Sequence, residues 1–206
     1  MTLETVFRLA IALSALVAAV MALVLRTPSA RPSSQKTFES SDPSSDRKTQ
    51  WLLAFSSVVL GVLVGGVVIV PQWMAPWRIG LSIFWRGVGI PLVLVGLCLF
   101  HRSLMALGRS WANSDRPHAD SLLVTDGPYR WVRHPYYSAT FLLLGGISLM
   151  ADQWPIAVGS TILSILLGLR GHREEIHLAE RFAAPYLDYQ SRTGMFLPKA
   201  VQWKRS

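Results

Sequence analysis

Long runs of apolar residues alternate with polar segments along the chain. The first run covers residues 5–25, the second covers 51–70 and ends at Pro71, and the third covers 87–107. A helix needs about 20 mostly apolar residues to cross a bilayer. Each of these runs is therefore long enough to predict a membrane-spanning helix.

Two shorter apolar runs follow, over residues 138–151 and 154–169, and only Asp152 and Gln153 separate them. This spacing predicts a tight helical hairpin whose arms are short for a full crossing. Beyond it, apolar residues recur every three or four positions, which predicts a helix that continues out of the fifth run. The apolar face of that helix comprises Ile176, Ala179, Phe182, Ala183 and Tyr186.

These elements predict an all-α integral membrane protein with about five transmembrane helices and a cytosolic C-terminal helix. Residues 26–50 are rich in Ser, Pro and charge, a composition typical of chain without fixed structure. We therefore divide the chain into a first transmembrane helix (1–25), a flexible cytosolic linker (26–50) and a membrane domain (51–206). The Trp-rich stretch 71–86 is predicted to lie at the membrane interface.

The charges predict an orientation. The chain has 206 residues, of which 51% are hydrophobic and 16% charged, and a net charge of +8. With five spans and the N-terminus outside, seventeen of the 20 Lys and Arg residues fall in cytoplasmic segments. Because cytoplasmic loops of membrane proteins are enriched in Lys and Arg, this bias favours that topology. It also explains the basic charge without a nucleic-acid partner.

The usual signatures of metal and nucleotide sites are missing from the sequence. It has no HExxH, Walker loop, GxGxxG or GxSxG motif, and its five histidines have no common metal-site spacing. The single cysteine, Cys98, excludes an internal disulfide framework. Gly61 and Gly65 form a small-xxx-small pattern, which predicts a helix contact.

Polar and aromatic residues gather in two segments on the predicted cytosolic side, 121–137 and 170–198. The first contains "DGPYRWVRHPYY", and in the second Arg170 and Glu174 share a helix face at a spacing of four. Such residues also have a simple explanation. Arginines and tyrosines anchor helix ends at lipid headgroups, and an exposed ion pair contributes only about 0.3–0.5 kcal/mol. The residues alone thus predict a cytosolic site where Arg, His, Tyr and Glu could converge.

The order of motifs is more specific than any one of them. "LVTDGPYRWVRHPYY", a short helical hairpin, and then an arginine, a Glu pair and a terminal "LP" resemble the isoprenylcysteine carboxyl methyltransferase family and the wider group that contains phospholipid methyltransferases. The resemblance covers residues 87–198, and the first two spans do not contribute to it. It implies a membrane enzyme that uses S-adenosyl-L-methionine to methylate the carboxylate of a lipophilic acceptor.

The resemblance also implies roles for individual residues. Arg170, Glu174 and Arg133 are the candidate catalytic residues, and Arg170 would also bind the substrate's anionic group. Glu174 can pair with the cofactor ammonium, Arg133 and His134 can hold its carboxylate, and tyrosine faces can lie against the sulfonium. The candidate cofactor-binding residues are Ser121, Leu122, Leu123, Val124, Tyr129, His134, Pro135, Tyr136, Tyr137 and Glu174.

Other functions remain open at this point. A phospholipid amine N-methyltransferase would need a base, for which His134, His172 or His177 could serve. A non-catalytic membrane protein that binds a lipid or a nucleotide is a further alternative. A transporter is disfavoured because charged residues are confined to the ends of the apolar runs. The family pattern is altered at Ala139, Ser121 and Thr193–Gly194, which leaves the acceptor open.

Overall fold

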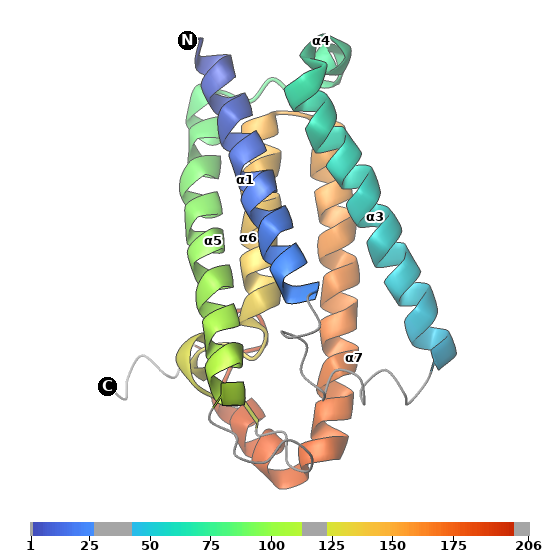
Figure 1. Ribbon diagram of the computed structural model, residues 1–206, viewed down its shortest axis with the longest axis vertical. Coiled ribbons are helices and arrows are strands. Elements are labelled where there is room, and N and C mark those ends of the chain that lie inside the picture. The colour runs from blue at the N-terminus through green and yellow to red at the C-terminus, as the bar shows by residue number, and fades with distance from the viewer. Residues whose placement is uncertain (1, 27–42, 113–122, 200–206) are drawn as a thin grey trace.

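The protein is a bundle of long helices. The computed structural model describes residues 2–26, 43–112 and 123–199, and no strand forms within these ranges. The long helices lie along the long axis of the molecule and alternate in direction (Figure 1). They are α1 (Leu3–Arg26), α3 (Pro43–Ile69), α5 (Ile83–Ala112), α6 (Pro135–Ala151) and α7 (Trp154–Arg192).

Among the described residues, three helices are long and apolar enough to cross a membrane. They correspond to Thr49–Ile69 in α3, Ile83–Leu107 in α5, and α7, whereas α6 is apolar but shorter. The all-helical membrane fold predicted from the sequence is thus confirmed. The count of five crossings stays a prediction.

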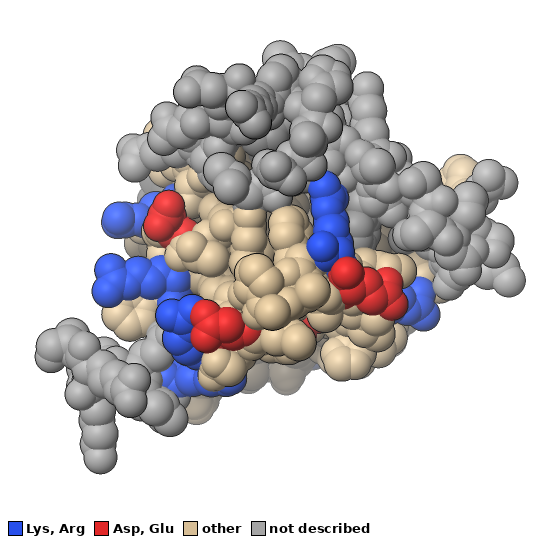
Figure 2. All heavy atoms as spheres, turned by 90° about the horizontal axis from the view of Figure 1, so that it is seen from below, with Lys and Arg blue, Asp and Glu red and all other residues tan. Residues whose placement is uncertain are grey.

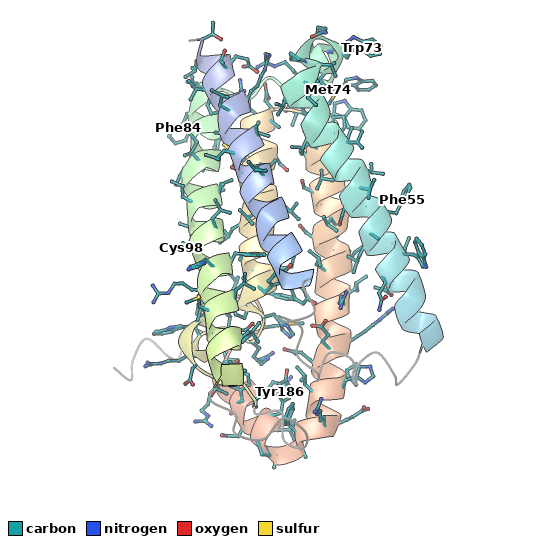
Figure 3. The ribbon with its side chains drawn as sticks, in the orientation of Figure 1. Phe55, Trp73, Met74, Phe84, Cys98 and Tyr186 are labelled. Carbon is teal, nitrogen blue, oxygen red and sulfur yellow. The ribbon has the colours of Figure 1, made fainter. Side chains whose placement is uncertain are left out.

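Two helices begin earlier than the apolar runs predict. α3 includes residues 43–50, which we expected to belong to the flexible linker. α5 begins at Ile83 rather than at residue 87. We expected the charged Arg86 to lie before the helix, but it lies within the first turn. Its guanidinium is buried and donates to the carbonyl of Met150 from Nε (3.2 Å) and Nη2 (3.1 Å). The stretch 71–86 therefore contains α4 (Pro71–Met74), η2 (Ala75–Trp77) and the first turn of α5. Figure 3 places Trp73 and Met74 at this end of the bundle.

The predicted hairpin is confirmed. α6 ends at Ala151 and α7 begins at Trp154, with Asp152 in the left-handed conformation (φ 55°, ψ 39°). The Asp152 side chain is fully buried and accepts hydrogen bonds from Arg78 Nε (3.1 Å) and from the backbone N–H of Leu81 (2.8 Å). The strained turn is thus fixed by the loop that precedes α5.

The helix predicted to continue out of the fifth run is present, but it is bent. α7 extends to Arg192, and Ala183 within it has non-helical angles (φ 46°, ψ −125°), two residues before Pro185. The predicted continuous face through Ala183 and Tyr186 is therefore wrong. The bend returns the chain toward the start of α6, where η3 (Gly127–Arg130) also lies (Figure 1).

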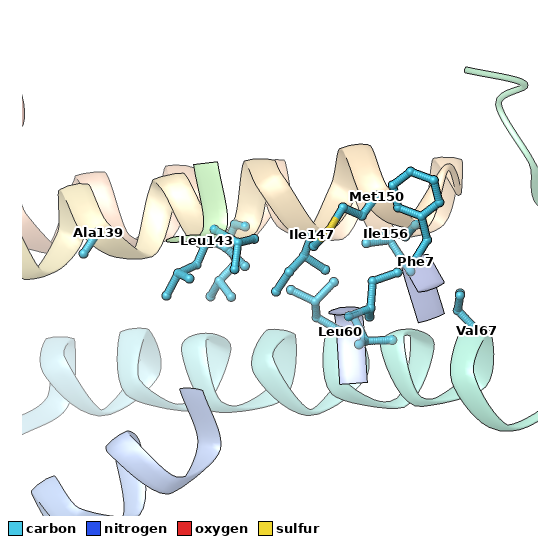
Figure 4. Close-up of a cluster of buried hydrophobic side chains, with 14 of the residues drawn as sticks. Phe7, Leu60, Val67, Ala139, Leu143, Ile147, Met150 and Ile156 are labelled. Atoms are coloured by element: carbon cyan, nitrogen blue, oxygen red, sulfur yellow. The ribbon is translucent and has the colours of Figure 1, made fainter. Parts of the chain in front are cut away.

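Close helix contacts hold the start of α6 in place. A Cβ built on Gly146 of α6 would lie 2.7 Å from the carbonyl oxygen of Gly89 on α5, so only glycine fits this crossing. α6 also packs against α7 and α1, and Figure 4 shows Leu143 and Ile147 pointing from α6 into the apolar core. The apolar core therefore packs α6 between its neighbours and fixes the position of His134 and Tyr137 at its start.

Candidate active site

The candidate site lies at the end of the bundle where α6 begins. The chain entering α6 pairs with the chain leaving α7: Arg133 N donates to the Gly194 carbonyl (2.8 Å) and His134 N to the Met195 carbonyl (3.0 Å). Seen from this end, cationic and acidic side chains lie beside one another around a central area of other residues (Figure 2). The bend in α7 thus brings the two predicted site segments together.

Glu174 is at the centre of the first cluster. Its Oε1 accepts hydrogen bonds from Tyr137 Oη (2.8 Å) and Arg170 Nε (3.0 Å). His134 Nδ1 lies 3.8 Å from its other oxygen, Oε2. The Glu174 side chain remains 21% exposed, so a ligand can reach it. Four of the residues singled out from the sequence therefore converge.

Glu175 forms a second, buried cluster that the sequence analysis missed. It accepts a hydrogen bond from Arg133 Nε (2.5 Å), and the side chains of both residues are only 8% exposed. Arg133 Nη1 also donates to the carbonyls of Gln190 (3.2 Å) and Thr193, and Gln190 Nε2 donates to Glu175 (3.3 Å). Arg133 thereby ties α6 to the end of α7. Successive side chains on a helix point about 100° apart. The adjacent Glu174 and Glu175 therefore face different partners, a difference that the helix geometry alone could have predicted.

An aromatic wall adjoins the Glu174 cluster. The rings of His134 and Tyr137 are stacked, with centroids 5.5 Å apart and an interplanar angle of 16°. Phe196 packs against both rings, at 5.8 Å and 6.4 Å. A Cβ on Gly171 would lie 3.2 Å from Phe196 and Tyr137, so the glycine makes room for this wall. Phe196 follows the end of α7, where no periodic pattern marks it.

Burial controls the charge of two groups here. Removal from water lowers the pKa of His134, while the nearby carboxylates of Glu174 and Glu175 act in the opposite direction. His134 Nε2 is buried and makes no hydrogen bond to the described residues, although Glu175 Oε1 lies 3.5 Å away. Burial also raises the pKa of Tyr129, which keeps this phenol neutral.

The remaining predicted residues have varied surroundings. Leu123 and Val124 are partly buried and have no regular structure, whereas Ser121 and Leu122 lie outside the described residues. The ring of Tyr136 packs against Phe100 of α5, with centroids 4.8 Å apart. Pro135 is buried at the first position of α6, and the Tyr129 carbonyl accepts a hydrogen bond from Tyr189 Oη (2.6 Å). Tyr189 was not singled out from the sequence.

Together these groups can bind a ligand that carries both signs of charge. A partly exposed carboxylate can pair with a cation, stacked aromatic rings can face it, and Arg170 can pair with an anion. The buried hydroxyl of Tyr186, at the bend of α7 (Figure 3), makes no hydrogen bond to the described part of the chain. Like His134 Nε2, it is a polar atom that a ligand could satisfy.

Comparison with known proteins shows which family these motifs are similar to. Residues 89–180 match the model of the isoprenylcysteine carboxyl methyltransferase (ICMT) family. The chain is 31% identical over 122 residues to the human protein-S-isoprenylcysteine O-methyltransferase, covering 57% of this chain and 43% of the human protein.

Two further relatives match a larger part of the chain. One is a probable protein-S-isoprenylcysteine O-methyltransferase of Oryza sativa subsp. indica, 28% identical over 152 residues (72% of this chain, 76% of the relative). The other is the nickel-cobalt-cadmium resistance protein NccN of Alcaligenes xylosoxydans xylosoxydans, 27% identical over 152 residues (72% and 63%). The chain spans less than two thirds of the NccN and human proteins.

Proposed function

We propose that the chain is an integral membrane methyltransferase that uses S-adenosyl-L-methionine, because its residues 89–180 match the model of the ICMT family. The acceptor is a lipophilic small molecule, and the atom methylated is a carboxylate oxygen. The observation that carries the proposal is the convergence of Tyr137, Arg170 and His134 on one partly exposed carboxylate, Glu174.

The residues present fit this cofactor, which supplies an electrophilic methyl group on a sulfonium sulfur. In the proposal Glu174 pairs with its ammonium group, and the rings of Tyr137 and His134 face its cationic part. Tyr129, Pro135, Tyr136, Leu123 and Val124 complete the pocket in this proposal, while the candidates Ser121 and Leu122 lie outside the described residues. The unbonded, buried Nε2 of His134 is a further donor or acceptor for it.

Arg133 has two proposed roles. The family resemblance assigns it to the cofactor carboxylate, together with His134. The contacts to Glu175, Gln190 and Thr193 support a second role, in which Arg133 holds the C-terminal segment over the pocket. In that role it positions His134 rather than touching the reacting atoms.

Arg170 orients the acceptor in this proposal. Its side chain is 31% exposed, and its Nε donates a hydrogen bond to Glu174, which holds the guanidinium beside that carboxylate. A carboxylate acceptor is already ionised at neutral pH and needs no general base. The protein then has to align the attacking oxygen with the methyl carbon and the sulfur.

An amine acceptor is the second candidate, because one feature favours it. His134 lies between two carboxylates, 3.8 Å from Glu174 and 3.5 Å from Glu175, an arrangement in which an imidazole can accept a proton. A phospholipid amine could then be methylated after losing its proton. Label transfer from methyl-labelled cofactor into lipid extracts separates the two candidates, since the products are a base-labile ester and a stable amine.

We further propose that α1, α3, α5, α6 and α7 each cross the bilayer, with the N-terminus outside and the site in the cytoplasm. The distribution of Lys and Arg supports this orientation. The water-soluble cofactor would then enter from the cytosol, and the lipophilic acceptor from the membrane.

Calorimetric titration of S-adenosyl-L-methionine into the detergent-solubilised protein tests the proposal. We expect binding by the wild type and loss of binding in Glu174→Ala. The matched control is Glu180→Ala. Glu180 is an acid on the same helix, and its side chain is 71% exposed. Absence of binding in a folded wild type would reject the methyltransferase and leave a non-catalytic lipid-binding protein.

A further inference from the structure

Two features of the described bundle lie apart from the candidate active site. The first is the space beside Gly61 and Gly65. The close helix contact predicted there is wrong, because a Cβ built on either glycine meets no atom within 4 Å, and no charged side chain borders this space. The second is a group of charged side chains at the opposite end of the bundle from the site, where α1 begins and the α6–α7 turn lies (Figure 1). Its charges can attract a polar ligand.

This group, which we call the hairpin cluster, joins α1 to α5, to the loop before α5 and to the turn after α6. Glu4 is at its centre: Oε2 accepts a hydrogen bond from Arg86 Nη1 (2.8 Å) and lies 3.7 Å from Arg78 Nη2. Arg8 Nη2 lies 3.9 Å from the other oxygen, Oε1. With Asp152 as the second acid, three arginines face two carboxylates. The cluster therefore carries one excess positive charge.

The three arginines are used to different extents. Arg86 is buried, and all three of its guanidinium nitrogens donate hydrogen bonds to groups of the protein. Arg78 donates from Nε and Nη2 to Asp152 (3.1 Å and 3.0 Å). The Arg8 side chain makes no hydrogen bond to the described residues, and its Nε is buried. A buried donor without a partner is costly, so an anion that accepted from Arg8 would stabilise the cluster.

The two arginines that solvent can reach flank the same carboxylate. The Arg8 side chain is 33% exposed and that of Arg78 is 44% exposed, and each lies within 4 Å of Glu4. Asp152 is fully buried, so Glu4 is the acid that an approaching anion meets, and it meets two cations there as well. Guanidinium groups match the geometry of phosphate oxygens with paired donors. The chemistry of the cluster thus fits a phosphate group.

The surroundings of the cluster indicate its depth in the membrane. Four tryptophans at this end of the bundle are exposed, and Figure 3 labels one of them, Trp73. Tryptophan is enriched at the level of the lipid headgroups. Phospholipid phosphates lie at the same level, so they are the anions nearest to the cluster. The four tryptophans are Trp73, Trp77, Trp85 and Trp154.

We propose that the hairpin cluster binds the phosphate of an anionic phospholipid, in the leaflet opposite the candidate active site. A phosphate diester carries one negative charge, which balances the excess charge of the cluster, and its oxygens accept hydrogen bonds from Arg8 and Arg78. The acyl chains lie along exposed apolar side chains that follow Arg8 on α1, such as Leu9 and Leu13. The lipid thereby links α1, which lies outside the family match, to residues 71–86. This binding does not depend on the methylation chemistry.

Native mass spectrometry of the detergent-solubilised protein tests the proposal, because it resolves lipids bound one at a time. The probes are dioleoylphosphatidylglycerol, dioleoylglycerol, which has the same tails without the phosphate, and sn-glycerol 3-phosphate, which has the phosphate without the tails. Arg8→Gln removes the charge and the unpartnered donor. The matched control is Arg130→Gln, which removes an exposed arginine from the other end of the bundle. Circular dichroism verifies that the variants are folded.

The first phosphatidylglycerol should bind to the wild type and to Arg130→Gln at least about tenfold more tightly than dioleoylglycerol. Arg8→Gln should lose this difference, because a hydrogen bond to a charged group contributes about a factor of ten in affinity. An equal loss in both variants, or no loss in either, would mean that arginines only anchor the protein to headgroups in general. Equal binding of glycerol 3-phosphate would mean that the ligand is a soluble phosphate. Each of these results overturns the proposal.

Photolabelling of the wild type decides the question if Arg8→Gln does not fold. A phosphatidylglycerol with a diazirine close to the ester of one acyl chain should label residues 3–14 of α1 or residues 71–86. Excess phosphatidylglycerol should prevent this labelling, and excess dioleoylglycerol should not. Labelling only elsewhere in the chain, or labelling that phosphatidylglycerol does not reduce, would contradict a phosphate site at the hairpin cluster.

Discussion

The buried ion pair between Arg133 and Glu175 should be the most sensitive point of the candidate site. Replacing Arg133 with Met keeps an unbranched apolar side chain in place of the aliphatic part of arginine but removes the guanidinium and its charge. Glu175 would then be a buried carboxylate, 8% exposed, without its cationic partner. The carbonyls of Gln190 and Thr193 would also lose their donor.

The expected loss of stability follows from this burial. Removing one partner of a buried ion pair costs about 3–5 kcal/mol, because the other charge stays in a region of low dielectric. For a chain of this size each kcal/mol lowers the unfolding temperature by roughly 2–4 °C. Arg133→Met should therefore unfold about 6–20 °C below the wild type.

Thermal unfolding in detergent, followed by circular dichroism, measures this shift. Arg130→Met is the control, because Arg130 is exposed and its guanidinium contacts only the Trp131 ring among the described residues, at 5.5 Å. The double variant Arg133→Met/Glu175→Met should be more stable than Arg133→Met alone, since no buried charge remains. If Arg133→Met unfolded at the same temperature as Arg130→Met, the pair would not hold the C-terminal segment.

Three further outcomes follow from the structure. Gly146→Ala should lower the free energy of unfolding by about 1–3 kcal/mol, because the added methyl group clashes with α5. Gly145 has open space around it, so Gly145→Ala should change this free energy little. Equal effects of the two variants in chemical denaturation would contradict the close contact at Gly146. Burial lowers the pKa of His134, so the unfolded chain binds its proton more readily and stability should fall as the pH drops below about 6.5. The dependence of the unfolding temperature on pH should be weaker in His134→Gln than in the wild type. If it were unchanged, groups other than His134 would cause it. Ala183→Gly should raise the free energy of unfolding by about 1 kcal/mol, because glycine adopts a positive φ without strain. Ala184→Gly, the neighbouring control, should lower this free energy. If both variants lowered it, Ala183 would not be strained.

The sequence predicts the helices well because a bilayer crossing demands a long apolar run, which is visible without any tertiary information. It predicts the boundaries less well because they depend on contacts between distant segments. Arg86 continues α5 because Met150 and Glu4, far away in the sequence, satisfy its guanidinium. No local pattern near Arg86 carries that information.

The candidate site follows the same rule. Arg170 and Glu174 were predicted from their spacing of four, which the helix itself enforces. The contacts of Glu175 and the position of Phe196 were missed because they depend on the bend at Ala183. A positive φ usually selects glycine, so an alanine at this position gives no sign of the bend.

The charged side chains at the two ends of the bundle have different surroundings. This difference favours a functional site at the end where α6 begins. At the end with the hairpin turn, Arg8, Arg78 and Arg86 all lie within 4 Å of Glu4, at 3.9 Å, 3.7 Å and 2.8 Å. Asp152 is completely buried there and accepts hydrogen bonds through both carboxylate oxygens.

At the other end, Glu174 is only partly engaged. Its Oε1 accepts two hydrogen bonds, but no described residue donates one to Oε2, and the nearby His134 Nδ1 lies 3.8 Å away. The side chain is also exposed enough for a ligand to approach. A carboxylate held in place on one oxygen and open on the other is suited to bind a cation from solution. At the hairpin end, by contrast, Asp152 is closed off from solvent, and three arginines surround the partly exposed Glu4.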